Sequence, residues 1–279
     1  MIVCFAVDQD SQKALAVWHI VKEREGISDY YLLTVSDLRV CSCEYDSGLR
    51  FSDIKCDVVV VIGGDGFMLK AIHALLEYRI QIYGINAGTV GFLLNKYVVG
   101  VLMNDILTAR IVMLPTLAME VRHSDGSMSV YHAVNEVSLI RQTKQSAKIE
   151  IYLNSTNMGN IVGDGILVAT PAGSTAYNSA ARGPILPLNS RCIAMTPICI
   201  FRPRGWNGAV IEDSSRVEFS ILEAEKRPVN ATADFWECRD VSTVSVSMNN
   251  ALRTVLLFSG REGLDKRVLN EQFGGIKLT

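Results

Sequence analysis

The segment Gly63-Gly64-Asp65-Gly66 has residue types that suit the chemistry of phosphate groups. It follows an apolar run and precedes a helical pattern, and ligands of open α/β sheets bind at that edge of the sheet. Glycines allow backbone N–H groups to approach an anion closely, and the N-terminus of a helix adds positive potential. The carboxylate of Asp65 suits proton acceptance, hydroxyl binding or metal binding. A structural turn, in which Asp65 caps the helix, explains the segment about equally well.

A second glycine-rich segment runs from Gly84 to Leu93 with the sequence GINAGTVGFL. It follows the next expected strand, so it should leave the sheet at the same edge as Asp65. Its glycine spacing differs from the dinucleotide fingerprint GxGxxG, and the sequence contains no P-loop motif, GxxxxGKS or GxxxxGKT. Phe92 could stack on a nucleotide base, although a phenylalanine more often belongs to the core.

Asn135 and Glu136 interrupt an apolar β segment between Val134 and Val137. Neighbouring residues of a strand point to opposite faces, so one of the two side chains faces the core. A buried polar side chain costs free energy unless it is hydrogen-bonded. The pair therefore predicts a binding site or, as the more common case, an edge strand or bulge with both side chains in water.

The stretch Gly163–Tyr177, with the sequence GDGILVATPAGSTAY, combines several candidate groups. Asp164 lies in a second Gly-Asp-Gly, which leads into a strand and then a turn that contains proline and glycine. The residues after the turn predict a short helix that ends before a Gly-Pro pair, with Ser174 as its N-cap. Thr175 and Tyr177 add hydroxyl groups near the start of that helix, where they suit a sugar, an amide or a phosphate.

The spacing of apolar residues predicts the helices and strands that position these residues, and it differs between the two parts of the chain. In the first hundred residues apolar runs alternate with helical patterns, which favours an open parallel sheet with helices on both faces. Strands are expected at Ile2–Val7, Tyr30–Val35, Val58–Ile62 and Ile80–Ile85. One helix is expected from a cap at Ser11 to about Arg24. A second helix is indicated by the stripe Met68, Ile72, Leu75 and Leu76.

Beyond about Arg110 the apolar period changes from about 3.6 to 2, which predicts a mostly antiparallel β-sandwich. Alternating segments include Ile149–Leu153, Val217–Ile221 and Val244–Met248, and a hairpin turn is indicated by Asp125-Gly126. The fold class is therefore a Rossmann-like α/β domain over residues 1–110 and a β-rich domain over residues 111–261. A C-terminal helix over about residues 262–279 is expected to pack on the first domain.

The composition is that of a globular chain of 279 residues, 49% hydrophobic and 20% charged, with a net charge of −2. Such a length allows about two domains. The lack of a basic excess argues against a nucleic-acid partner. No apolar stretch reaches the ~20 residues of a membrane-spanning helix, and Met1–Val7 resembles a buried strand more than a signal peptide. Seven cysteines, an odd number, favour a reducing compartment, so a cytoplasmic location is expected.

Other ionisable residues give little indication of chemistry. The four histidines are scattered, and none is spaced with cysteines as a zinc site requires. Cys41, Cys43 and Cys56 are close in sequence but have no fourth ligand nearby, so no metal site built from protein ligands is expected. The absence of a GxSxG motif gives a hydrolase triad no starting point.

The order of these motifs resembles the NAD kinase family. The resemblance runs from about Val58 to Ile200 through GGDG, GINAGTVGFL, Asn-Glu and GDGILVATPAGSTAY. GGDG also occurs in diacylglycerol-, sphingosine- and phosphofructokinase-type enzymes, whereas TPAGSTAY after GDG is much narrower. The chain departs from the family pattern at Ala180 (usually Ser), at Phe201 (within a usual Pro-His-Ser-Leu segment) and at Phe235 (within a usual Asp-Gly-Gln).

The resemblance implies a role for each motif. Asp65 would position or deprotonate the ribose 2′-hydroxyl of NAD, and Phe92 would line the adenine pocket. Asp164 would contact the dinucleotide across a subunit interface, because family members are homodimers or homotetramers. The ATP phosphates would be cradled by Gly63, Gly64 and Gly66. NAD would be held by Asn135, Glu136, Ser174, Thr175, Ala176 and Tyr177. A divalent metal, normally Mg²⁺, would accompany ATP.

The leading interpretation is transfer of the γ-phosphoryl of ATP to the 2′-hydroxyl of the adenosine ribose of NAD, which gives NADP. Two alternatives stay open: a non-catalytic NAD(P)-binding regulatory module, and a lipid or sphingoid-base kinase that shares GGDG. The intact carboxylate of Asp65 weighs against the first alternative, and TPAGSTAY weighs against the second. The expected partners are NAD and ATP, and polyphosphate stays open as an alternative phosphoryl donor. Neither a nucleic acid nor a membrane is expected as a partner.

Overall fold

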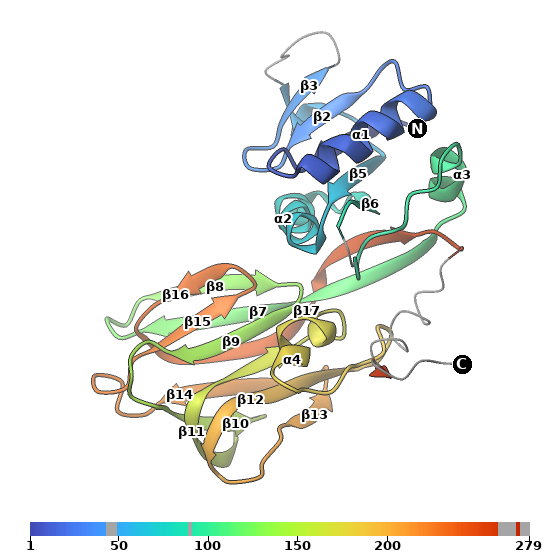
Figure 1. Ribbon diagram of the computed structural model, residues 1–279. Coiled ribbons are helices and arrows are strands. Elements are labelled where there is room, and N and C mark those ends of the chain that lie inside the picture. Colours follow the sequence, from blue (N-terminus) through green and yellow to red (C-terminus); the bar gives the residue numbers. More distant parts are fainter. Residues whose placement is uncertain (43–48, 89–90, 262–271, 274–279) are drawn as a thin grey trace. The chain divides into compact units, whose positions relative to one another are not determined.

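The computed structural model describes residues 1–42, 49–88, 91–261 and 272–273 (Figure 1). Over these residues the chain forms two compact units. The first comprises residues 1–114 and 252–261, and the second comprises residues 115–251 and 272–273. Across the described part of the chain, no helix combines the length and apolarity needed to span a membrane.

The first unit contains a sheet in which one interior strand is buried on both faces. Its strands are β1 (Val3–Val7), β2 (Tyr31–Thr34), β3 (Arg39–Ser42), β4 (Leu49–Arg50), β5 (Val58–Gly63), β6 (Gln81–Asn86) and the end of β17 (Val241–Phe258). Their hydrogen-bonded order is β4-β3-β2-β1-β5-β6-β17, with all pairs parallel except β2–β3 and β3–β4. The predicted parallel sheet is confirmed. The run VVVVI in β5 suits it because side chains on both faces of this strand are buried.

Two helices of the first unit cover opposite faces of this sheet (Figure 1). These two helices are α1 (Gln12–Arg24) and α2 (Asp65–Leu75). The unit also contains the short helix α3 (Leu102–Leu107) and the 3-10 turns η1 (Phe51–Asp53) and η2 (Leu76–Tyr78). Trp18 of α1 belongs to a buried cluster with Tyr83 and Ile85 of β6. Gly84 faces the other way, because strand residues alternate, and Met68 of α2 packs there, 3.3 Å from where a Gly84 Cβ would lie.

Local signals set the ends of the first two helices. Ser11 caps α1 as predicted, because its Oγ accepts a hydrogen bond from the Ala14 amide at 3.3 Å. The chain leaves α1 through Gly26, whose φ of +63° lies in the region that glycine tolerates best. α2 begins at Asp65, and its N-cap is Gly64, which has no side chain with which to cap. The Asp65 carboxylate is therefore left for contacts other than the cap of its own helix.

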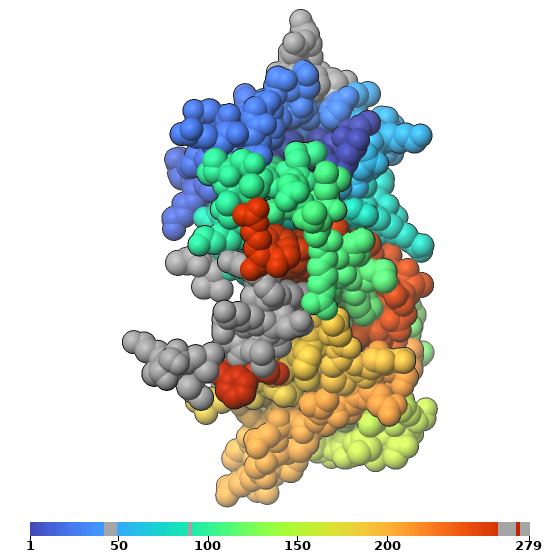
Figure 2. Space-filling view, turned by 90° about the vertical axis from the view of Figure 1, so that its right-hand side faces the viewer, coloured from blue at the N-terminus to red at the C-terminus, as the bar shows by residue number. Residues whose placement is uncertain are grey.

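Asn95 ties the end of β17 to β6 inside the first unit. Its Nδ2 donates to the carbonyl oxygens of Gly84 at 3.1 Å and Leu257 at 2.9 Å, and its Oδ1 accepts from the Ser259 amide at 3.0 Å. The residue is almost completely buried. Figure 2 shows residues 252–261 in red beside the green segment 91–107. One side chain thus joins segments 162 positions apart.

An Asn95→Ala variant is expected to lose about 3 kcal/mol of unfolding free energy, because the Leu257 carbonyl and the Ser259 amide would stay buried without their partner. Urea denaturation measures the change. Asn104→Ala, on the exposed surface of α3, is the matched control and should change stability by less than about 0.5 kcal/mol. Equal losses in the two variants would contradict the bracing role of Asn95.

The second unit is an antiparallel β structure with a large hydrophobic core, as predicted. Its strands are β7 (Arg110–His123), β8 (Met128–Ala133), β9 (Glu136–Arg141), β10 (Ala147–Leu153), β11 (Thr156–Ala169), β12 (Cys192–Arg202), β13 (Ala209–Glu212), β14 (Arg216–Ile221), β15 (Val229–Ala233), β16 (Trp236–Cys238) and the first part of β17. A 3-10 turn, η3 (Gly173–Thr175), and a one-turn helix, α4 (Tyr177–Ala180), follow β11. The core gathers alternate strand residues such as Ile149, Val217, Phe219 and Val244.

Two features differ from the sequence expectations, and a third expectation falls almost entirely outside the described residues. β9, which begins at Glu136, is not an edge strand, because it pairs with both β11 and β15. The end of β17 pairs with β6 in the first unit rather than staying with the β-rich domain. The predicted C-terminal helix lies outside the described residues apart from residues 272–273, and there Gln272 Nε2 donates to the Ile185 carbonyl of the second unit at 3.0 Å.

Candidate active site

The two glycine-rich segments meet at one edge of the sheet in the first unit. β5 and β6 pair in parallel with Gly63 opposite Asn86, and the Ala87 amide donates to the Gly63 carbonyl oxygen at 2.9 Å. Thr89 and Val90 of the second segment lie outside the described residues. This is the edge expected from the sequence, because the carboxyl ends of neighbouring parallel strands coincide.

The carboxylate of Asp65 is held by the second glycine-rich segment. Its Oδ2 accepts a hydrogen bond from the Phe92 amide at 3.1 Å, and its Oδ1 accepts one from the Leu93 amide at 3.2 Å. Asp65 and Phe92 are both half-buried. A carboxylate with both oxygens engaged by main-chain donors has a fixed orientation, which is what a residue that must align a reacting group requires.

The glycines of GGDG differ in what surrounds them. A Cβ on Gly63 would lie 2.8 Å from Cδ1 of Phe67, so this glycine is required by the packing of α2 on β5. A Cβ on Gly64 or on Gly66 would meet no heavy atom within 4 Å. Packing therefore explains Gly63, whereas at Gly64 and Gly66 the backbone is accessible, as close approach of an anion requires.

In the second unit, Asp234 holds the main chain at the Asn-Glu pair. Its carboxylate accepts hydrogen bonds from the amides of Val134 at 2.7 Å, Asn135 at 3.0 Å and Glu136 at 3.1 Å. The amide of Asp234 in turn donates to the Glu136 carbonyl oxygen at 3.1 Å. Sequence reasoning did not assign Asp234 to the site. Its signal is the remnant of the Asp-Gly-Gln pattern, but the contact joins residues about a hundred positions apart and only the fold creates it.

The turn after β11 packs directly on the Asn-Glu pair. The Thr170 amide donates to the Asn135 carbonyl oxygen at 2.9 Å, and Thr170 Oγ1 donates to the Val134 carbonyl oxygen at 2.7 Å. Thr170 Oγ1 also accepts from the Gly173 amide at 3.0 Å. A Cβ on Gly173 would overlap the Asn135 carbonyl group and lie 2.5 Å from Asn135 Cα. The glycine of TPAGSTAY is therefore required because two backbone segments touch there.

Ser174 has a role other than the predicted N-cap. It lies inside η3, and its hydroxyl donates to the Pro171 carbonyl oxygen at 2.7 Å and accepts from the Leu186 amide at 2.9 Å. The N-cap of α4 is Ala176, which has no capping side chain. The sequence prediction of a Ser174 cap is wrong because the turn tightens into a 3-10 helix first. Ser174 is fully buried and joins the turn to the segment that follows α4.

Asn178 is a second buried polar residue that sequence reasoning did not single out. Its Nδ2 donates to the carbonyl oxygens of Ser174 at 3.1 Å and Pro184 at 2.9 Å, and its Oδ1 accepts from Thr196 Oγ1 at 2.6 Å. A Cβ on Gly183 would overlap Asn178 Oδ1. The network fixes the one-turn helix that begins at Tyr177.

The remaining residues of TPAGSTAY are more accessible. Thr175 and Ala176 are half-buried, and Tyr177 is 36% exposed. Thr175 Oγ1 donates to the Ala172 carbonyl oxygen at 3.3 Å. Burial, together with the negative charges of Cys199, Glu136 and Asp164, raises the pKa of the Tyr177 phenol. Glu136, Asp164 and Tyr177 are therefore close enough to influence one another.

Glu136 has the unusual electrostatics expected of a functional carboxyl group. Burial and then the negative charge of Asp234 raise its pKa to about 8, while a hydrogen bond from the Tyr177 amide acts in the opposite direction. Its Oε2 is buried and has no hydrogen-bond partner among the described residues. Perturbed carboxyl groups of this kind cluster at functional sites.

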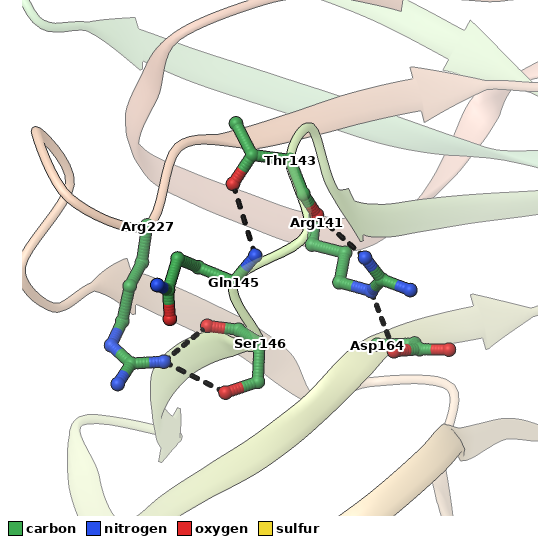
Figure 3. A network of polar contacts seen from close by, with 6 residues as sticks. All are labelled: Arg141, Thr143, Gln145, Ser146, Asp164 and Arg227. Atoms are coloured by element: carbon green, nitrogen blue, oxygen red, sulfur yellow. Dashed lines mark hydrogen bonds and ion pairs between the residues drawn. The ribbon is translucent and has the colours of Figure 1, made fainter.

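Asp164 forms an ion pair with Arg141, a residue that sequence reasoning did not single out (Figure 3). Arg141 Nε donates to Asp164 Oδ1 at 2.6 Å, and Arg141 Nη1 donates to the Thr143 carbonyl oxygen at 2.6 Å. Arg227 Nη1 binds both the carbonyl oxygen and the hydroxyl of Ser146 at 2.7 Å. These contacts order the loop between β9 and β10. Arg141 and Asp164 are about one-third exposed, so the pair contributes little to stability but orients the Asp164 carboxylate.

Among the described residues, no three His, Cys, Asp or Glu side chains gather as a metal site would require. The six described cysteines are all free thiols, and Cys43 lies outside the described residues. The described residues thus do not fit a metal held by protein ligands.

The fold resembles that of solved kinases of NAD and NADH. A crystal structure of yeast NADH kinase complexed with NADH matches with a TM-score of 0.76 and 19% sequence identity, over 100% of this chain and 89% of that one. A structure of an NAD kinase from Archaeoglobus fulgidus in complex with ATP matches with a TM-score of 0.74 and 19% identity, over 98% and 99% of the two chains. At such identity these likenesses concern the fold.

Comparison of sequences finds relatives that are more similar to this chain than the two solved structures are. Residues 8–98 match the family described as ATP-NAD kinase N-terminal domain, and residues 134–236 match the ATP-NAD kinase C-terminal domain. The NAD kinase of Caulobacter vibrioides is 46% identical over 228 residues, which cover 80% of this chain and 88% of that protein. The NAD kinase of Rickettsia rickettsii is 45% identical over 222 residues, covering 79% and 87%. With both domains matched in order and four-fifths of the sequence aligned to such relatives, the chain belongs to the NAD kinase family.

Proposed function

We propose that this chain transfers the γ-phosphoryl of ATP to the 2′-hydroxyl of the adenosine ribose of NAD. The observation that carries the proposal is the Asp65 carboxylate, which stands at the start of α2 with both oxygens held by main-chain amides. Membership of the NAD kinase family and the relatives named NAD kinase support it. A binding module would have no need of a fixed carboxylate in a phosphate-binding turn.

In the proposed reaction the 2′-oxygen of the ribose forms a bond to the γ-phosphorus, and the bond from that phosphorus to the β–γ bridging oxygen breaks. ADP leaves, and the hydroxyl proton passes to Asp65. General base assistance of this kind contributes about 10²–10⁴-fold to a rate. The accessible backbone at Gly64 and Gly66 would bind the donor phosphates, with Gly63 supporting the turn by its packing, and Phe92 would contribute to the adenine pocket.

NAD would be bound by residues of the second unit. Asn135, Glu136 and Tyr177 would supply hydrogen bonds, with Thr175 and Ala176 lining the same turn. Ser174 is completely buried, so its contribution would be to hold that turn in place. Asp164, oriented by Arg141, would contact the dinucleotide of a neighbouring subunit in a homodimer or homotetramer. A cytoplasmic location and a divalent ion brought in with ATP complete the proposal.

A coupled assay for NADP with purified protein tests the function. NADP should form with NAD, ATP and Mg²⁺, and parallel reactions with polyphosphate or NADH would define the range of donors and acceptors. Calorimetric binding of NAD without any NADP formation, with either donor, would instead identify a non-catalytic binding module. Phosphorylation of a sphingoid base or diacylglycerol in place of NAD would identify a lipid kinase.

A further inference from the structure

We propose that Asp234 is a positioning residue of the NAD site, which fixes the main chain of Asn135 and Glu136 and so aims the Glu136 carboxyl group at the ligand. The inference rests on the proposed function, because it takes Glu136 to contact NAD. Asp234 itself need not touch substrate. It acts through the residues whose amides it binds.

The contacts of Asp234 are unusually complete for one turn residue. Its carboxylate accepts from three consecutive amides, at 2.7 Å from Val134, 3.0 Å from Asn135 and 3.1 Å from Glu136. Its own amide donates to the Glu136 carbonyl oxygen at 3.1 Å. Asp234 lies in the turn between β15 and β16 and has a φ of +52°.

These bonds occur where the strand ladder stops. β9 and β15 pair from Arg141 opposite Val229 to Val137 opposite Ala233, and that register does not extend to the residues before Val137. From that point the Asp234 carboxylate accepts the hydrogen bonds of the main-chain amides of Val134, Asn135 and Glu136. Charge-assisted bonds to main-chain amides are short and directional, so they hold residues whose pairing with β15 has ended.

The position of Asp234 also affects the charge of Glu136. A buried carboxyl beside a second carboxylate favours its neutral form, and the pKa of Glu136 is raised to about 8 by burial and by Asp234. The other groups that act in this cluster are the Tyr177 amide and phenol, the Asp164 carboxylate and the Cys199 thiol. His132 of β8 lies two residues before Val134 and is a further titratable group nearby. The Oε2 of Glu136, which has no hydrogen-bond partner among the described residues, would be the atom that a polar group of the ligand meets.

The test compares Asp234→Asn with the wild-type chain over pH 6 to 9. We expect the KM for NAD to rise roughly tenfold, because the Asn135–Glu136 segment loses its anchor. The KM for ATP and kcat should change by less than about twofold. The pH at which kcat/KM for NAD changes should move to lower pH, because removal of a negative neighbour lowers the pKa of Glu136. Glu136→Gln should lack that transition.

Two controls separate positioning from general stability. Asp240→Asn is matched, since Asp240 also has a φ of +52° in a turn after β16, and it should leave both KM and the transition unchanged. His132→Gln should retain the transition at its wild-type pH. A folded Asp234→Asn with wild-type KM for NAD and an unmoved transition would overturn the inference. If that variant does not fold, a transition that persists in Glu136→Gln overturns it instead. A wild-type chain that forms no NADP refutes the proposed function, which is a separate outcome.

Discussion

Asp65→Asn is expected to lower kcat by about 10²–10⁴-fold while the fold is retained, because an amide cannot accept the proton of the attacking hydroxyl. The amide oxygen can still accept one of the two main-chain hydrogen bonds, from Phe92 or from Leu93, so the loop after β6 keeps one of its anchors. Steady-state kinetics with NAD and ATP measure the change, and calorimetry should give an NAD affinity within a few-fold of the wild type.

The structure supplies a competing account of Asp65, in which it only braces the loop that carries Phe92. That account predicts a different pattern, with a lower unfolding free energy and a higher KM for ATP but with little change in kcat. Denaturation of the variant alongside the kinetics therefore distinguishes the two. Turnover close to that of the wild type would remove Asp65 from the chemical step.

Gly173→Ala is expected to destabilise the second unit by about 3 kcal/mol and to weaken NAD binding. The new methyl group would overlap the Asn135 carbonyl group, which is main chain and cannot rotate away. Overpacking in a well-packed interior costs about 1–3 kcal/mol, and a clash with backbone belongs at the upper end. The displaced segment contains the Asn-Glu pair, so the KM for NAD should rise. Urea denaturation and the NADP assay measure the two effects.

The matched control is Gly66→Ala in the other motif. Gly66 lies in the first turn of α2 and has room for a Cβ, and alanine is favoured over glycine in helices by up to about 1 kcal/mol. Stability should therefore be equal or higher. If donor phosphates approach this backbone, the KM for ATP should rise without a loss of stability. A Gly173→Ala variant as stable as Gly66→Ala would show that the close approach at Asn135 is not required.

Much of the first unit was predictable because its signals are local. The VVVVI run of β5 and the Ser11 cap depend on residues close in sequence, and both were found as expected. The shared edge of the two glycine-rich segments followed from one general rule about parallel strands. At Ser174 the prediction of a helix cap was wrong, because the residue lies inside a 3-10 turn and its hydroxyl accepts a hydrogen bond from the Leu186 amide.

The sequence predicted which residues of the second unit belong to the candidate site, but it did not predict how they contact one another. Asn135 and Glu136 are notable in sequence, yet whether they lie on an edge strand depends on β11 and β15, which come later in the chain. The anchor at Asp234, the Arg141–Asp164 pair and the raised pKa of Glu136 all arise from contacts between distant segments. No periodicity in the sequence reports such contacts.

The sequence by itself determined the family, the two hydrophobic periods and the residue types available for phosphoryl transfer. These properties depend only on short motifs and on the order of those motifs along the chain. The tertiary structure alone decided which glycine is required by packing, which carboxylate is held by amides and which carboxyl is forced toward its neutral form. The physical reason is that close packing, hydrogen bonding and desolvation depend on neighbours in space, and the chain brings those neighbours together only when it folds.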